Sequence, residues 1–448
     1  MVRRPARIAV TLGVLLAFTP GRVSAQQTDS PAAQLHDLAE QNRKLQEQVA
    51  AQQKLIEKLS AEMAEMRQSS DRHEQELKTL REGTDSTSAD HALPGASDAV
   101  VRLSGEAGLA FFETGTRGQF PNAEFRVDDA KLFLEARVWE DIYAVSEIDL
   151  LTREASTEDI YLGSFYADLE GVGRRWLGDH ALNVRVGRFA VPFGEEYQVR
   201  GVMDNPLISH SLSDIWGFDE GVELFGSTGK ASYVVAVQNG GISRLHDFNA
   251  DKSVAGRIGY DPQPWLHLSA SAMRTGALSA KSDTLSEIWF GNGFFRPLGP
   301  AATTQTFHAE VYELDGAGRW QSGHVAAAVG LAHFNDDAPG AHDARRLHYW
   351  YVEAQQNLAG GLYGVVRYSA IRVPGGYPLV GFGNAGSYFY NPAAPLTENL
   401  ERLSFGLGYR IAPPVVLKLE YSRERGETLT GIDRDYEDFF STELGLKF

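Results

Sequence analysis

The sequence predicts an all-β fold: a transmembrane barrel of sixteen antiparallel strands, preceded by an α-helical coiled coil. Three observations support this prediction. Apolar and polar residues alternate from residue 100 to the C-terminus, which is typical of barrel strands. No run of about 18 apolar residues, the length that a membrane-spanning helix needs, follows the N-terminal region. The last strand alternates as well and ends in Phe448.

Residues 1–25 have the parts of a secretory signal peptide. Basic residues lie at the start, Ile8–Phe18 is an apolar run too short to span a bilayer, and Val23-Ser24-Ala25 is a small-residue cleavage site. The alternative is an amphipathic anchor that stays attached. Cleavage would remove four arginines and no acidic residue, and so change the formal net charge from −17 to −21.

The composition narrows the classes of function. A net charge of −17 argues against a nucleic-acid partner, because nucleic acids are themselves anionic. The chain has 0 cysteines, so disulfides do not stabilise this exported protein. Hydrogen bonding in a closed barrel would serve instead. The 45 glycines, 17 tyrosines and 23 phenylalanines suit a barrel with tight turns and aromatic girdles at the two membrane surfaces.

Residues 35–82 are predicted to form a coiled coil in the periplasm. Apolar residues recur there with a heptad period, and neither Gly nor Pro interrupts the stretch. Asn42 and Gln52 occupy core positions, where polar side chains set the register and the number of chains. A coiled coil needs partner helices, so we predict a homotrimer. The alternative is a single solvated helix that lies on the protein.

The barrel itself is predicted over residues 100–448, after a linker at residues 83–99. Short turns such as Pro413-Pro414 suit the periplasmic rim, and long connections such as Thr275–Ala302 suit the extracellular rim. A last strand that ends in phenylalanine resembles the signal read by the barrel-assembly machinery of the outer membrane. The sixteen predicted strands are Val100–Phe112, Glu124–Trp139, Asp141–Leu151, Asp159–Leu169, Ala181–Ala190, Glu220–Gly226, Ala231–Asn239, Lys252–Tyr260, Trp265–Arg274, Thr303–Leu314, Arg319–Phe334, Arg345–Asn357, Gly361–Val373, Asn399–Ile411, Pro414–Arg425 and Phe439–Phe448.

In a barrel of this width, one face of each strand meets lipid and the other lines a water-filled lumen. Leu417 and Leu419 would then face lipid, and Lys418 and Glu420 the lumen. A soluble β-sandwich would bury the same apolar face in a dry core, and periodicity alone does not separate the two. The lumen-facing bases predicted in this way are Arg102, Lys131, Arg137, Arg185, Arg257, Arg367, Arg402, Arg410 and Lys418, and the acids are Glu106, Glu135, Glu147, Asp149, Glu353 and Glu420.

One stretch carries a more specific signal. Val186-Gly187-Arg188-Phe189-Ala190-Val191-Pro192-Phe193-Gly194-Glu195 resembles the signature of the phosphate-selective porin O and P family. An insertion without a regular period follows, which is uncommon between strands unless it has a function. The resemblance implies an outer-membrane porin in which the segment after the Pro-Phe turn folds into the barrel and narrows the pore.

The candidate site is therefore a size-limiting eyelet, formed by Glu195–Ser213 against basic residues of the wall. Facing charges of opposite sign in a narrow pore sort solutes by charge and dipole. The planar guanidinium group of arginine can hold two oxygens of a phosphate or carboxylate. The alternative for each single residue is a solvated charge at the rim. The predicted pore residues are Glu195, Glu196 and Asp204 on the acidic side, and Arg185, Arg188, Arg200, Lys131 and Arg137 on the basic side.

From these features we expect passive diffusion of small polar or anionic solutes, with phosphate and polyphosphate as candidates. Family members that select anions line the eyelet with an excess of Arg and Lys, whereas here Glu195 and Glu196 directly follow the turn. The expected location is the outer membrane of a Gram-negative cell. The expected partners are membrane lipid, lipopolysaccharide, the solute and two further copies of the chain, with no nucleic acid.

Two alternatives remain open at this point. One is a barrel that displays its loops as an adhesin or receptor, with the aromatic stretch Gly364–Tyr390 as the surface. The other is an outer-membrane hydrolase. Its candidate histidines form no recognisable catalytic arrangement, and we predict neither an enzyme nor a catalytic residue, metal site or cofactor. These histidines include His210, His246, His308, His324 and His348.

Overall fold

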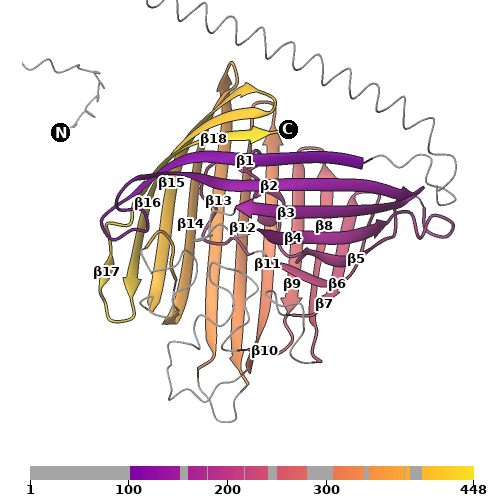
Figure 1. Cartoon of the computed structure of the whole chain (residues 1–448). Helices are drawn as coiled ribbons and strands as arrows, with labels where there is room; N and C mark the ends of the chain where they lie inside the picture. The colour runs from indigo at the N-terminus through magenta and orange to yellow at the C-terminus, as the bar shows by residue number, and fades with distance from the viewer. Residues whose placement is uncertain are drawn as a thin grey trace, which may run out of the picture. The chain divides into compact units, whose positions relative to one another are not determined.

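The computed structural model describes residues 101–151, 160–178, 180–215, 217–240, 250–279, 306–337, 343–377, 379–383 and 396–448. Over these residues the regular structure is almost entirely β-strand (Figure 1). No helix among them is long and apolar enough to cross a membrane. The predictions of a signal peptide at residues 1–25, a coiled coil at 35–82 and a linker at 83–99 lie outside the described residues.

The strands form one closed antiparallel wall. Each long strand pairs with the next long strand along the chain, and β1 pairs with both β2 and β18, which closes the barrel. Figure 1 shows β18 beside β1. The predicted count of sixteen long strands is confirmed, and two further strands, β10 and β17, are two residues long. The elements are β1 (Val101–Thr114), β2 (Glu124–Trp139), β3 (Ile142–Leu151), β4 (Tyr161–Leu169), β5 (Asn183–Ala190), the 3₁₀ helix η2 (Glu196–Val199), β6 (Phe218–Thr228), β7 (Ala231–Gln238), β8 (Ser253–Gln263), β9 (Leu266–Arg274), β10 (Leu278–Ser279), β11 (Thr306–Trp320), β12 (Gly323–Asp336), β13 (Arg345–Ala359), β14 (Leu362–Tyr377), β15 (Thr397–Ala412), β16 (Val415–Thr428), β17 (Asp433–Arg434) and β18 (Phe439–Lys447).

The alternation along the strands places apolar side chains on the outside of the barrel. On β16, Leu417 and Leu419 are 46% and 41% exposed, whereas the intervening Lys418 and Glu420 are 2% and 0% exposed. A soluble sandwich would show the opposite pattern, because its apolar face would be its core. The exposure therefore excludes the sandwich and agrees with a barrel that faces lipid outside and carries polar side chains inside.

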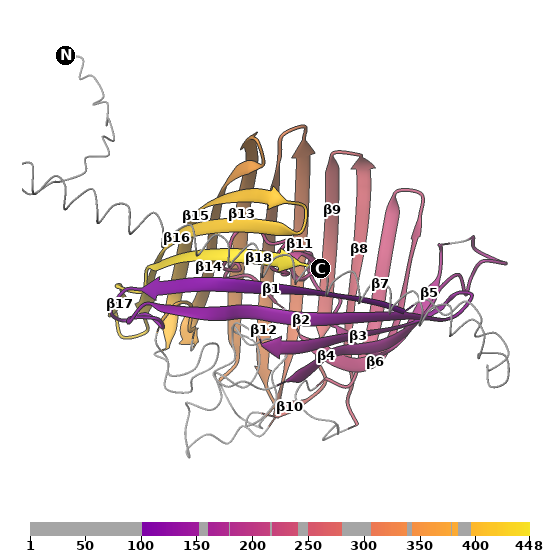
Figure 2. The same cartoon turned by 45° about the horizontal axis from the view of Figure 1, so that its top comes forward.

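Exposed tryptophans mark the rim that carries the short turns. Trp139 ends β2, Trp265 lies between β8 and β9, and Trp320 ends β11; they are 53%, 56% and 47% exposed. Figure 2 shows the turn between β8 and β9 at the upper rim of the barrel. Aromatic side chains of this kind concentrate where a membrane meets water. The short turns therefore define one membrane surface, as the sequence predicts for the periplasmic rim.

Inside the wall, tyrosine rings cover glycines on the neighbouring strand. Tyr349 on β13 lies opposite Gly330 on β12, and Tyr363 on β14 lies opposite Gly408 on β15. A Cβ atom at Gly330 or Gly408 would overlap the tyrosine ring. Tyr349 is 0% exposed and Tyr363 2% exposed, so each glycine provides the space that a buried ring needs. The same device appears twice in the wall.

We predict that Gly330→Ala lowers the stability of the barrel. The new methyl group would push Tyr349 out of its position, and overpacking of this kind costs about 1–3 kcal/mol. The measurement is the urea midpoint of unfolding in detergent micelles. Gly318→Ala is the matched control on β11, because the nearest atom to its Cβ would be 3.5 Å away, an ordinary contact. Equal midpoints for the two variants would contradict the packing argument.

Candidate functional site

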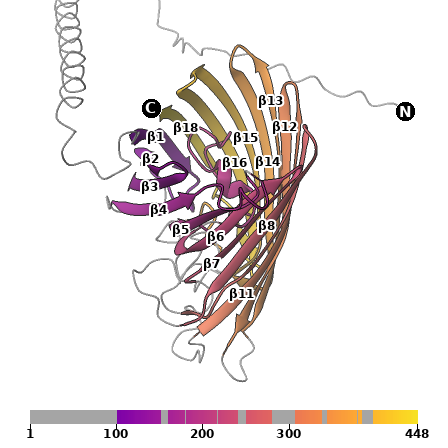
Figure 3. The ribbon, with the colours of Figure 1, turned by 90° about the vertical axis from the view of Figure 1, so that its right-hand side faces the viewer.

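The chain leaves the wall after β5 and enters the barrel. Val191–Gly194 begins this excursion: Pro192 lacks a backbone donor for the ladder, and Gly194 has a φ of +70°, which side chains other than glycine rarely allow. We call residues 191–215 the constriction segment. In Figure 3 it lies between the wall formed by β1–β6 and the wall formed by β13–β16. The resemblance implied this inward fold, and the structure shows it.

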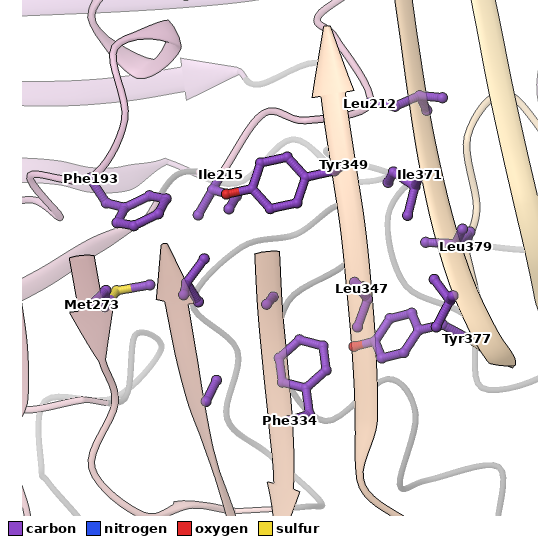
Figure 4. Close-up of a cluster of buried hydrophobic side chains, with 14 of the residues drawn as sticks. Phe193, Leu212, Ile215, Met273, Phe334, Leu347, Tyr349, Ile371, Tyr377 and Leu379 are labelled. Atoms are coloured by element: carbon purple, nitrogen blue, oxygen red, sulfur yellow. The ribbon is translucent and has the colours of Figure 1, made fainter. Parts of the chain in front are cut away.

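Apolar side chains fix the constriction segment to the far wall. Phe193, Leu212 and Ile215 are 1%, 1% and 6% exposed and belong to one buried cluster with Tyr349 and Ile371 of the wall (Figure 4). Each such side chain contributes about 1.5–3 kcal/mol when it is fully buried. The segment is therefore packed as part of the barrel core and does not behave as a surface loop.

A carboxylate from the wall holds the middle of the segment. Glu420 on β16 accepts hydrogen bonds from the backbone nitrogens of Ile208 and Ser209, at 2.7 and 2.8 Å, and from Ser209 Oγ at 2.5 Å. Glu420 is 0% exposed. A buried charge is tolerated only when its acceptor oxygens are well supplied with donors, and the segment supplies them. Segment and wall therefore depend on each other.

Three wall bases bind carbonyl groups of the same stretch. Arg367 donates to the carbonyl of Ser209 at 2.7 Å, Arg402 to that of His210 at 2.9 Å, and Lys418 to that of Leu207 at 3.1 Å. Wall carboxylates contact the other side of each base: Glu353, Glu424 and Glu443 respectively. These bases face the lumen as predicted, but the constriction segment covers them.

The beginning of the segment is tied to a different part of the wall. Glu195 pairs with Arg257, whose Nε lies 3.2 Å away, and it lies 3.1 Å from His267 Nε2. Glu196 accepts from Ser211 N at 2.9 Å, which joins the two ends of the segment. Burial raises the pKa of Tyr197 above its ordinary value of 10.0, and the nearby positive charge of Arg257 opposes the shift. Tyr197 therefore stays neutral, and Arg257 meets its ring as a cation over an aromatic face.

Two of the predicted basic residues line the wall opposite the anchored segment. Lys131 on β2 lies 3.0 Å from Glu147 and 3.7 Å from Asp149 of β3. Arg185 on β5 donates to Asp168 at 2.7 Å and lies 3.2 Å from Glu223. Both bases are thus shared between two carboxylates.

The remaining segment charges differ in their surroundings. Arg200 contacts the buried Asp214 within the segment itself. Asp204, by contrast, is exposed. The neighbouring Gly201 approaches the wall at Glu106, whose oxygen would be 2.9 Å from a Cβ added there. Glu106 in turn lies opposite Lys131 in the ladder between β1 and β2. Asp204 therefore belongs to the β1–β2 side of the lumen.

The prediction that Arg188 lines the pore is wrong. Arg188 lies opposite Glu220 in the ladder and pairs with it at 3.0 Å, on the same face as the exposed Phe165 and Val186. Successive side chains of a strand point to opposite faces, so Arg185 inside requires Arg188 outside. Arg188 also donates to the carbonyl of Gly163 at 3.1 Å.

Arg137 is not brought to the constriction segment either. Its guanidinium donates to the carbonyl of Glu140 at 2.8 and 3.1 Å, in the turn between β2 and β3. The residues that sequence reasoning missed as partners of the segment are Glu420, Arg367, Arg402 and Lys418. Their lumen-facing phase was readable from the alternation, but nothing local indicates that they bind residues about 160–210 positions away.

Comparisons with known proteins support the fold. No protein-family model and no curated protein matches the chain. The structure is similar to the outer membrane channel DcaP of Acinetobacter baumannii, with a TM-score of 0.53 and 12% identity over 80% of this chain and 99% of that one. It is also similar to in-vitro folded OmpT, an outer membrane protein of Vibrio cholerae, in its trimer form, with a TM-score of 0.52 and 11% identity over 78% of this chain and 99% of that one. The shared feature is the outer-membrane β-barrel fold.

We predict that Glu420→Gln loosens the constriction segment. Gln has one acceptor oxygen where Glu420 has two, so a donor of Ile208 or Ser209 loses its bond, at a cost of about 1–3 kcal/mol. Limited proteolysis should cut residues 195–213 faster, and the single-channel current should become larger and noisier.

Glu401→Gln is the matched control for this experiment. Glu401 is also a strand carboxylate, but it lies on the outer face of β15 and pairs with Arg372, away from the segment. This variant should keep the wild-type cleavage rate and current. The anchoring role of Glu420 is disproved if both variants match the wild-type protein.

Proposed function

We propose that the protein is an outer-membrane porin through which small polar solutes diffuse passively. The observation that supports this most directly is the constriction segment, which is anchored inside a closed barrel by buried hydrogen bonds from β14, β15 and β16. A fixed segment of this kind limits the size of what passes without needing to move. The lumen-facing side chains of β2–β6 remain polar and charged, as a water-filled path requires.

The location and assembly follow from the same features. The apolar outer face and the tryptophan rim support insertion in the outer membrane, where lipid and lipopolysaccharide would surround the barrel. The heptad pattern of residues 35–82 supports a homotrimer with its coiled coil in the periplasm. The similar OmpT structure is in a trimer form. We propose no chemical step and therefore no enzymatic activity.

The finer hypothesis is that the solutes are anionic and include phosphate or polyphosphate. It rests on the resemblance at residues 186–195 and on the bases near the segment. In the structure Arg185 already lies between Asp168 and Glu223, and Arg200 contacts Asp214. A phosphate would therefore have to compete with carboxylates at both bases.

The porin proposal predicts discrete single-channel conductance for the full chain in a planar bilayer. Phosphate titrated into a chloride solution then tests the finer hypothesis. A block that Arg185→Gln abolishes would support phosphate binding, and conductance without a block would keep the porin but remove phosphate. Folded protein that gives no conductance would overturn the porin proposal.

The trimer proposal predicts heat-modifiable migration on a gel. Unboiled protein extracted in mild detergent should run at about three times the mass of the boiled chain, because barrel trimers resist dissociation at room temperature. Deletion of residues 35–82 should weaken this band if the coiled coil contributes. A folded band at the monomer mass in the full chain would refute the trimer.

A further inference from the structure

We propose that the open part of the lumen passes cations in preference to anions, because the wall of β2–β6 and the exposed face of the constriction segment are both net negative. This inference rests on the proposed porin function and goes against the anionic solutes that the resemblance implies. It depends on which charges the segment covers and which it leaves in contact with water.

Charges of both signs are covered on the wall of β13–β18, where Glu353, Glu420, Glu424 and Glu443 are buried together with three bases. Side chains of Arg367, Arg402 and Lys418 are only 5%, 7% and 2% exposed, since they bind carbonyl groups of the segment. They hold structure together and are withdrawn from the path. In the wall of β2–β5, by contrast, the side chains of Lys131 and Arg185 keep 21% and 24% exposure. Solutes in the lumen are therefore in contact with the wall of β2–β5.

Two clusters on that side each hold two acids and one base in direct contact. Lys131 pairs with Glu147 and Asp149, and Arg185 pairs with Asp168 and Glu223, so each base lies between two carboxylates. Each cluster therefore has one more carboxyl group than it has basic groups. Arg188, which would have restored the balance, points outward to Glu220.

A separate observation concerns Asp149. It is 6% exposed, and its Oδ1 atom accepts no hydrogen bond among the described residues. Its contact with Lys131 is at 3.7 Å, longer than a hydrogen bond and shared with the closer Glu147. Buried carboxylate oxygens are nearly always supplied with donors. Because this oxygen is buried on the lumen face of β3, Asp149 acts on a passing cation through its electrostatic field and not by direct contact.

The constriction segment adds a further negative charge on the β1–β2 side of the lumen. Within residues 191–215 the exposed residues are Gln198, Val199 and Asp204, and of these Asp204 alone is charged. Arg200, the nearest base in sequence, contacts Asp214, which is 0% exposed. The segment therefore presents a carboxylate to the path and keeps its own arginine bound.

These charges act together because the water-filled path is bounded by protein of low dielectric constant. Field lines focus in a narrow aqueous path between walls of low dielectric constant, so a small excess of one sign changes the local ion concentration strongly. The screening length is about 10 Å at 0.1 M salt. The preference should therefore be clear at 0.1 M salt and weaken at 1 M salt, where that length falls to about 3 Å.

The test is the reversal potential of the full chain in a planar bilayer under a tenfold KCl gradient. We expect the sign that denotes K⁺ preference. Asp204→Asn and Glu147→Gln should each lower the K⁺/Cl⁻ permeability ratio by about twofold, the scale of one screened charge. Lys131→Gln should raise the K⁺/Cl⁻ permeability ratio. If the substitutions only disturbed the structure of the wall, Lys131→Gln and Glu147→Gln would change this ratio in the same direction.

Glu113→Gln is the control for net charge. Glu113 has an exposed side chain on the outer face of β1, the face that also carries Phe111, and it lies opposite Phe440 of β18. Its replacement by Gln should leave the K⁺/Cl⁻ permeability ratio unchanged. A Cl⁻ preference in the wild-type protein, or equal shifts for Asp204→Asn and Glu113→Gln, would overturn the inference while the porin stands. Absence of conductance from folded protein would instead overturn the porin proposal itself.

Discussion

The structure depends on the closure of one antiparallel wall. In a bilayer no water is present to satisfy backbone N–H and C=O groups, so a strand can cross only where both neighbours supply its hydrogen bonds. Pairing of β1 with β18 removes the last free edge. Closure then fixes the register of all sixteen long strands, and register fixes which side chains face lipid and which face the lumen.

Once the faces are fixed, the interior has to compensate the charges it receives. The wall of β14–β16 carries Arg367, Arg402 and Lys418, and the constriction segment supplies the carbonyl oxygens that they need. In return, buried Glu420 receives donors from the segment. The segment is thus a structural requirement of that wall as well as an obstacle in the pore. On the wall of β2–β5 the side chains of Lys131 and Arg185 keep 21% and 24% exposure, so the two sides of the lumen differ in how much of their charge meets water.

Much of the fold was predictable, because its signal is local. The two-residue period identifies each strand and its outward face, as on β16, where Leu417 and Leu419 are exposed and Lys418 is buried. The same period also places Arg185 and Arg188 on opposite faces of β5. The family resemblance, which implies a pore position for Arg188, disagrees with this strand pattern, and the strand pattern is correct. The coiled coil at residues 35–82 stays a prediction.

The sequence by itself determined the barrel, the number of long strands, the inside and outside of each, and the place where the chain leaves the wall at Pro192 and Gly194. These follow from alternation and from backbone limits that act within a few residues. The tertiary structure alone decided where the constriction segment packs and which charges it covers. Glu420 and Ser209 are 211 positions apart, and only barrel closure brings them together. The charge selection that we propose is for that reason a property of the assembled lumen.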